Sequence, residues 1–421
     1  MLKSLTLRAV GPAPEMMIEF ADRLNVITGD NGLGKSFLLD VAWWALTRTW
    51  AATPALPTDP TRATITYVVK GKKGDAEPVT SKYRPDEQEW PGERKRPAMP
   101  GVVIYVRVDG GFSVWDPARN YWRKDRSDRP AAYHFNNRDV WDGLKVNDIS
   151  ASEGLERDWV SWQKGREPQF ELLERVLLRL SPPDLPLTPG PPKRVFLGEG
   201  FDRPTLLIGG NIVPVTVASA GIRRILALAY LLVWAWHEHR LAAELLGNEP
   251  ETRLALLIDE PETHLHPAWQ RRVIPAIMEA VQVLREQYDS PTQVLIATHA
   301  PLVLASLEPI FDVERDALFH LRLDGGHAQL NVESWAKQGD AANWLVSEVF
   351  GLQQARSTEA EEAIEAAEAF MREDHDALPE GLRSSDDINR RLRSLLPPHD
   401  PFWARWIVST ERPLRVSGRV S

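Results

Sequence analysis

Apolar and polar positions alternate in short stretches at the start of the chain, which predicts strands there. Residues 4–10 and 16–20 alternate in this way around a Gly-Pro turn. Residues 24–28 form an apolar run that predicts a buried strand, and the apolar segment 37–47 predicts a helix. A strand, a short loop and a helix therefore follow one another before residue 50.

The pattern changes twice between this helix and the middle of the chain. Alternation in residues 61–70, 102–108 and 111–115 predicts an antiparallel β insertion. Residues 138–180 show a helical pattern, and the Pro-rich segment 182–192 predicts a stiff connector.

Continuous apolar runs dominate the second half. Strands are expected at 205–208 and 212–216, and the run from 225 to 236 is too short to cross a bilayer, so it predicts a buried helix. Residues 254–258 are apolar at every position, as in a central parallel strand covered on both faces, and residues 293–298 form a similar strand.

These patterns predict an α/β fold, in which helices flank a mixed or parallel central sheet. We expect a core built from two separate ranges, a β and helical insertion between them, and a helical C-terminal extension. The expected ranges are 1–55 and 205–345 for the core, 56–204 for the insertion and 346–421 for the extension.

Composition narrows the class of protein. The 421 residues are enough for two or three domains, and an apolar content of 43% allows a sizeable core. The net charge of −9 excludes a polybasic nucleic-acid coat, so DNA contact would need a local patch. The chain has no cysteine, which excludes disulfides, thiolate zinc sites and a cysteine nucleophile. Because residues 1–5 lack the apolar core of a signal peptide, we expect a cytoplasmic protein without a membrane segment.

The loop between the first apolar strand and helix fits G-x-x-x-x-G-K-S, a pattern whose backbone N–H groups cradle phosphates. Glycines let the backbone curve around an anion, and the helix N-terminus adds partial positive charge. Lys35 would reach the β- and γ-phosphates, and the Ser36 hydroxyl would ligate Mg²⁺. The predicted nucleotide-binding residues, for ATP with Mg²⁺, are Gly29, Asp30, Asn31, Gly32, Leu33, Gly34, Lys35, Ser36 and Phe37.

Two later strands end in groups suited to hydrolysis. The strand 254–258 is followed by Asp259, which can hold Mg²⁺, and by Glu260, which can activate the attacking water as general base. The strand 293–298 ends at His299, which can hydrogen-bond the γ-phosphate or the water. A charged turn and a structural histidine are the alternatives. Because the chain also contains the phosphate loop, we favour Asp259 as metal ligand and Glu260 and His299 as catalytic residues.

Motif order gives a resemblance to the ABC-type ATPase fold of SMC, RecF and OLD-like proteins. Residues 31–36 look like the N-G-x-G-K-S loop of that group, and 218–221 (Ala-Ser-Ala-Gly) resemble its signature motif, where Ser-Gly or Ser-Ser is usual. Residues 258–267 are similar to the E-P-E-x-H-L-H-P run of OLD-like ATPases, and 298–301 to their switch-histidine motif. The resemblance covers residues 1–50 and 205–310 well.

This resemblance implies a head-to-tail homodimer or higher oligomer. Ser219 and the backbone of Gly221 from one subunit would close on the γ-phosphate held by the other, which suits an anion site at a helix start. The alternative is a plain N-cap, with Ser219 starting a core helix. The Q-loop glutamine of the family is not located, and Gln163 is a weak candidate.

Other residues support rival readings. Residues 70–130 contain 14 Lys and Arg and 10 Asp and Glu, and the aromatic residues between them are Trp90, Tyr105, Trp115 and Trp122. This composition allows a nucleic-acid-binding face. Because the excess of positive charge is small, we favour an ordinary solvated surface. The pairs His264/His266 and His237/His239 are expected to be structural rather than metal ligands.

The C-terminal region carries an isolated Asp374-x-Asp376 pattern, which we interpret as a solvated charge cluster and not as a nuclease. The extension looks like that of stand-alone ATPases of prokaryotic defence operons, of which Septu-type ATPases with a separate nuclease chain are the nearest. Phe402, Trp403 and Trp406 would suit either a partner-docking surface or a terminal helix packed on the ATPase core.

Three functions follow as hypotheses. The first is an ATPase whose dimer closure regulates a separate effector, expected to be a nuclease, in anti-phage defence. The second is a RecF-like repair ATPase, for which DNA would be a partner and would stimulate hydrolysis. The third is an ATP-bound scaffold with little turnover, for which Glu260→Gln would leave function intact.

Overall fold

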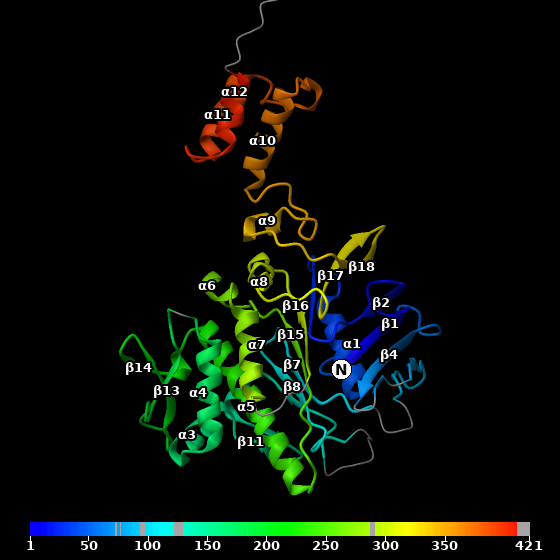
Figure 1. Cartoon of the computed structure of the whole chain (residues 1–421), viewed down its shortest axis with the longest axis vertical. Coiled ribbons are helices and arrows are strands. Elements are labelled where there is room, and N and C mark those ends of the chain that lie inside the picture. Colours follow the sequence, from blue (N-terminus) through cyan, green and yellow to red (C-terminus); the bar gives the residue numbers. More distant parts are fainter. Residues whose placement is uncertain are drawn as a thin grey trace, which may run out of the picture. The chain divides into compact units, whose positions relative to one another are not determined.

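The computed structural model describes residues 1–71, 74–75, 77–92, 98–121, 129–182, 184–286 and 291–410 of the chain (Figure 1). Its residues fall into two compact units, Met1–Trp344 and Leu345–Ser421. The division of the chain into core, insertion and extension stays a prediction.

The first unit is organised around a mixed sheet whose central strands are parallel. Five of its strands are parallel, and all of these except β17 (Asp316–Asp324) are buried over nearly their whole length, as expected for strands covered on both faces. In the described part of the chain the sheet has eight strands, in the order β18 (His327–Glu333), β17 (Asp316–Asp324), β3 (Leu24–Gly29), β16 (Thr292–Ala297), β15 (Leu254–Asp259), β7 (Val102–Val106), β8 (Phe112–Trp115) and β9 (Tyr133–Phe135). The mixed α/β class predicted from the apolar runs is confirmed.

Helix α1 (Lys35–Thr47) lies between this sheet and a second, antiparallel one. It is apolar on nearly every face because both sheets pack on it, and Trp43 and Trp44 fill the space between them. The second sheet consists of β2 (Glu15–Glu19), β1 (Leu2–Arg8), β4 (Thr64–Gly71) and β5 (Gly74–Asp75), with β6 (Val79–Lys82) also paired to β4.

Helices cover the other side of the central strands (Figure 1). The long α5 (Ala220–Leu245) is buried over most of its first 17 residues, which confirms the buried helix predicted from the apolar run. It contacts β7 and packs with α4 (Pro168–Leu180) and α7 (Val273–Leu284). The shorter helices of this unit are α2 (Asn137–Asp142), α3 (Leu155–Gly165), α6 (Pro267–Gln270) and α8 (Pro301–Leu307).

Two small sheets complete the first unit. One pairs β10 (Leu144–Val146) with β11 (Ile149–Ser152), and the other joins β12 (Thr188–Lys193), β13 (Arg203–Ile208) and β14 (Asn211–Pro214). A 3₁₀ turn, η1 (Val215–Val217), leads from β14 to α5.

Three sequence-based expectations need correction or refinement here. Residues 102–108 do not belong to an antiparallel insertion, because β7 pairs parallel with β15 inside the central sheet. The Pro-rich segment 182–192 is not only a connector, since β12 begins at Thr188 and pairs with β13. Trp90, Tyr105 and Trp115 are buried, so they cannot form the aromatic part of a nucleic-acid face, whereas Trp122 lies outside the described residues.

The second unit is helical and has its own core. Its elements are α10 (Thr358–Met371), η2 (His375–Ala377), α11 (Ser385–Leu395) and α12 (Phe402–Thr410), and α9 (Ala341–Leu345) spans the boundary between the units. Phe402 and Trp406 are buried with residues of α10 and α11, so the idea that these two aromatics form a docking surface is wrong. Trp403 is half-buried and donates a hydrogen bond to the carbonyl of Pro397. Asp374 and Asp376 are exposed, as a solvated charge cluster should be.

No helix in the described residues is long and apolar enough to cross a membrane.

Candidate functional site

The phosphate loop follows β3 and leads directly into α1. Gly29, Gly32 and Gly34 all have positive φ, at 132°, 81° and 101°. A Cβ on Gly29 would lie 2.0 Å from the carbonyl oxygen of Leu321, so the loop can approach β17 only with glycine there. Because Gly34 is the N-cap, no side chain caps α1, and its first turn contains no acidic residue. The N–H groups at the start of α1 therefore remain available to an anion.

Lys35 lies at the centre of this loop. Its ammonium donates hydrogen bonds to the carbonyl oxygens of Gly29, at 2.7 Å, and Asp30, at 2.9 Å. Burial lowers the pKa of Lys35, while the negative charges of Glu260 and Asp259 oppose that shift. The chain thus places the ammonium among the loop carbonyls and within the field of the two carboxylates that follow β15.

Ser36 and Asp259 meet at the carboxyl edge of the sheet. Burial raises the pKa of Asp259 to about 6, and the nearby Ser36 side chain opposes this shift. The Oδ1 atom of Asp259 is buried and has no hydrogen-bond partner within the described structure. The Ser36 hydroxyl and the Asp259 carboxylate, one of whose oxygens is unpartnered, form a donor set that suits Mg²⁺.

Glu260 and His299 form a second pair at the same edge. His299 Nδ1 lies 3.2 Å from Glu260 Oε1, and the side chains are 42% and 25% exposed. Glu260 has a φ of 47°, an uncommon conformation for a residue with a side chain, and its N–H donates to the carbonyl of Ala297. Thr263 Oγ1 donates to the second carboxylate oxygen, Glu260 Oε2, at 3.3 Å. The structure therefore holds this carboxylate beside the histidine and open to water.

Glu262 is a buried residue of this site to which the sequence analysis gave no role. Its Oε1 accepts hydrogen bonds from Thr298 Oγ1, at 2.7 Å, and from the N–H of His299, at 3.1 Å. Burial raises the pKa of Glu262. The residue stands in the E-P-E-x-H-L-H-P run, but only the fold shows that it orients the strand end that carries His299.

Two further residues near the site were missed. Burial raises the pKa of Asp40 in α1 to about 6, and the side chain of Tyr105 opposes this shift. Arg224 of α5 donates to carbonyl oxygens at the ends of β7 and β15. Neither residue lies in a motif, so only their positions in the fold connect them to the site.

Ser219 and Gly221 lie at the start of α5. Ser219 is exposed and acts as the N-cap, since its hydroxyl accepts a hydrogen bond from the N–H of Ile222 at 3.4 Å. Gly221 is buried, and a Cβ there would lie 2.8 Å from the carbonyl oxygen of His264. The N-cap role and a role toward a second subunit are compatible, because the Ser219 side chain faces solvent.

Three other candidates make local structural contacts. His239 is buried between Asp116 and the N–H of Glu251, and His266 caps α6. Gln163 donates to the carbonyl of Gly190, which gives it a local role and leaves the Q-loop glutamine unassigned. Among the described residues, no cluster of three or more His, Asp and Glu could hold a metal ion by itself.

Comparison with known families falls on the second half of this site. Residues 207–305 match the family described as "AAA domain, putative AbiEii toxin, Type IV TA system". The matched segment contains Ser219, the Asp259–Glu260 pair and His299, and the charges of Asp259 and Glu260 act on Lys35 of the phosphate loop. Over this segment, less than half of its length, the chain resembles that AAA-domain family.

Solved structures that resemble this chain include SMC head domains. The SMC head domain from Thermotoga maritima is 14% identical, with a TM-score of 0.38, and the match covers 79% of this chain and 99% of that one. An SMC head bound to the C-terminal winged-helix domain of ScpA is 14% identical, with a TM-score of 0.43 and coverage of 79% and 97%. A head domain bound to the C-terminal domain of ScpA, from Pyrococcus furiosus, is 13% identical, with a TM-score of 0.40 and coverage of 79% and 96%.

Proposed function

We propose that this chain binds ATP with Mg²⁺ in its phosphate loop and hydrolyses it in a site that a second copy completes. One observation carries the proposal: a helix start without a side-chain cap, the Ser36–Asp259 pair and the Glu260–His299 pair converge at one edge of the sheet. A nucleoside triphosphate needs an anion cradle, metal ligands and a base together, and the groups at this edge suit these three roles.

Each residue has a distinct part in the proposed hydrolysis. The N–H groups of the loop bind phosphate oxygens, and the Lys35 ammonium turns to them from the carbonyls of Gly29 and Asp30. Ser36 and Asp259 would hold Mg²⁺, which neutralises charge on the phosphates. Glu260 accepts a proton from the attacking water at its carboxylate, and His299 keeps that carboxylate in place.

The Lys35→Ala variant tests the binding half of this proposal. Loss of the ammonium should weaken binding of the fluorescent nucleotide MANT-ATP on the order of 100-fold, about 2.8 kcal/mol, because the phosphates lose a charged donor. The control is Lys145→Ala, which removes an exposed ammonium from β10. Equal affinity in the two variants would refute the assignment of Lys35.

We further propose that ATP-driven closure controls a separate effector, expected to be a nuclease, in anti-phage defence. Support comes from the matched family, whose description names a toxin and a type IV TA system. The test is affinity purification of the tagged chain with the products of adjacent genes, followed by a DNA-cleavage assay with wild type and Glu260→Gln. An effector whose cleavage is the same with both proteins would contradict this role.

A further inference from the structure

Arg224 connects α5 to the edge of the sheet where the catalytic groups lie. Its Nη2 donates long hydrogen bonds to the backbone carbonyl oxygens of Arg107, at 3.3 Å, of Asp259, at 3.3 Å, and of Glu260, at 3.5 Å. β7 and β15 are neighbouring parallel strands, and Arg107 and Asp259 stand at their carboxyl ends. One guanidinium thus holds two strand ends and the residue that carries the general base.

The turn that Arg224 holds is unusual in its backbone. Glu260 has a φ of 47° and His264 a φ of 64°, so both ends of the turn depart from ordinary conformations for residues with side chains. Such residues cost free energy and persist only where surrounding contacts hold them. The hydrogen bond to the Glu260 carbonyl is one of those contacts.

The start of α5 touches the other end of the same turn. Gly221 lies so close to the carbonyl of His264 that a Cβ would approach its oxygen to 2.8 Å. Gly221 and Arg224 are three residues apart and therefore lie on one face of the helix. Through these two residues, the helix start that carries Ser219 contacts both ends of the catalytic turn.

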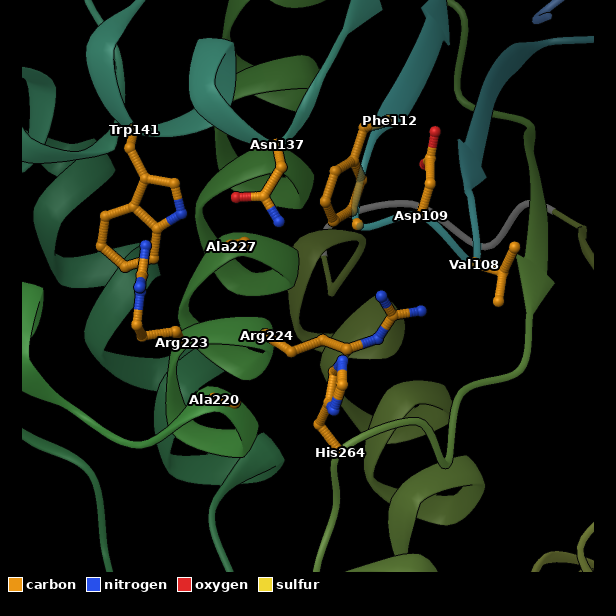
Figure 2. Close-up of a pocket in the computed structure, with 11 residues that line it drawn as sticks. Val108, Asp109, Phe112, Asn137, Trp141, Ala220, Arg223, Arg224, Ala227 and His264 are labelled. Atoms are coloured by element: carbon orange, nitrogen blue, oxygen red, sulfur yellow. The ribbon is translucent and has the colours of Figure 1, made fainter.

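Charge and space around Arg224 allow this contact to change. Burial lowers the pKa of Arg224, and the carboxylates of Asp259, Glu262, Asp109 and Glu260 oppose that shift. Its hydrogen bonds go to carbonyls, while those carboxylates attract it from further away. A cavity of about 170 Å³ adjoins it, and Figure 2 shows Arg224 extended over His264 while Arg223 turns toward Trp141. The guanidinium therefore has room to shift when α5 moves.

We propose that Arg224 is a positioning residue that couples the two composite sites of the dimer. It ties the helix start that would meet the partner's nucleotide to the Asp259–Glu260 turn of its own subunit. Engagement of Ser219 with the partner's γ-phosphate would then set the position of Glu260. This inference rests on the proposed ATPase function. It adds a route by which nucleotide binding at one site changes the position of Glu260 at the other.

The test compares Arg224→Gln with Arg223→Gln in the 421-residue chain. Arg223 precedes Arg224 on α5 and its guanidinium stacks on Trp141, 4.6 Å from the ring centre. We expect Arg224→Gln to keep MANT-ATP affinity within about twofold and to lower the single-turnover hydrolysis rate about 10- to 100-fold. In Arg224→Gln the Hill coefficient for ATP hydrolysis should fall from above 1 in wild type to about 1. Arg223→Gln should keep the wild-type hydrolysis rate and the wild-type Hill coefficient.

Arg224→Lys provides a second variant that keeps the positive charge. A lysine lacks the planar fork, so we expect an intermediate hydrolysis rate at unchanged MANT-ATP affinity. Rates for Arg224→Gln and Arg224→Lys within about twofold of Arg223→Gln would overturn the inference while leaving the ATPase function intact. A wild-type chain that neither binds MANT-ATP nor hydrolyses ATP would instead overturn the proposed function.

Discussion

Buried carboxyl groups dominate the electrostatics of single residues around the phosphate loop. Burial raises the pKa values of Asp40 and Asp259 to about 6, and it also raises the pKa of Glu262. A carboxylate without enough partners destabilises the fold when it is ionised. This cost is what a bound divalent cation would offset, which agrees with the predicted metal site.

The Asp259→Asn variant tests this cost. The folded-state pKa of Asp259, about 6, lies above the ordinary value of 3.8, so folding binds a proton and stability increases as pH falls through 6 toward 4. Without Mg²⁺ or nucleotide, the variant should be more stable than wild type at pH 8, by about 1–3 kcal/mol, and equally stable near pH 4. Urea unfolding at both pH values measures this. Exposed Asp30→Asn is the control, and a variant that is less stable than wild type at pH 8 would contradict the expectation.

The sequence located the residues whose chemistry is local and missed those that act through the fold. Ser36 and Asp259 were found because each stands in a motif, and the structure brings them together. Arg224 was missed because it donates to backbone carbonyls at the ends of two strands that are far apart in the sequence, and no pattern of side chains predicts such contacts. The catalytic roles of Glu260 and His299 stay predictions.

At the scale of elements, a close backbone contact with the turn after β15 fixes the position of the start of α5. Gly221 permits that contact, since a Cβ would meet the His264 carbonyl. The bias of helices toward alanine over glycine is about 1 kcal/mol, so Gly221→Ala would stabilise an unconstrained helix.

We expect Gly221→Ala to behave in the opposite way. The helix start must move away from the turn, so the single-turnover hydrolysis rate should fall about tenfold and the melting temperature should not rise. Gly198→Ala is the matched control, because a Cβ there meets no atom within 4 Å. Wild-type hydrolysis together with a higher melting temperature in Gly221→Ala would show that the contact is unimportant.

The error over β7 also belongs to this scale. Every residue of Val102–Val106 is buried, the signature of a central parallel strand, as it is for β15. The neighbouring hairpin with β8 favoured an antiparallel interpretation, and that hairpin does exist. The pairing with β15 could not be inferred, because it joins segments about 150 residues apart in the sequence.

At the scale of the whole molecule, the two units have separate cores. Trp406 is 2% exposed and belongs to the core of the second unit, so it does not serve as a free anchor for a partner. This arrangement was not predictable from composition, because an aromatic pair near a C-terminus suits an interface and a core equally well.

Trp406→Ala should therefore damage only the second unit. We expect a loss of about 3–5 kcal/mol in its local stability, seen as faster amide hydrogen exchange in α10 and α11, with unchanged MANT-ATP binding by the first unit. Trp403→Ala, at a half-buried site, should have a smaller effect. Equal exchange in the two variants would argue against this core.

Light scattering of the Glu260→Gln variant with saturating ATP and Mg²⁺ tests the central claim most directly. If two copies complete each nucleotide site, the variant binds ATP without hydrolysing it and elutes from size-exclusion chromatography as a dimer. An added Ser219→Arg substitution should then make it a monomer. A Glu260→Gln protein that binds MANT-ATP and still elutes as a single copy would contradict the account.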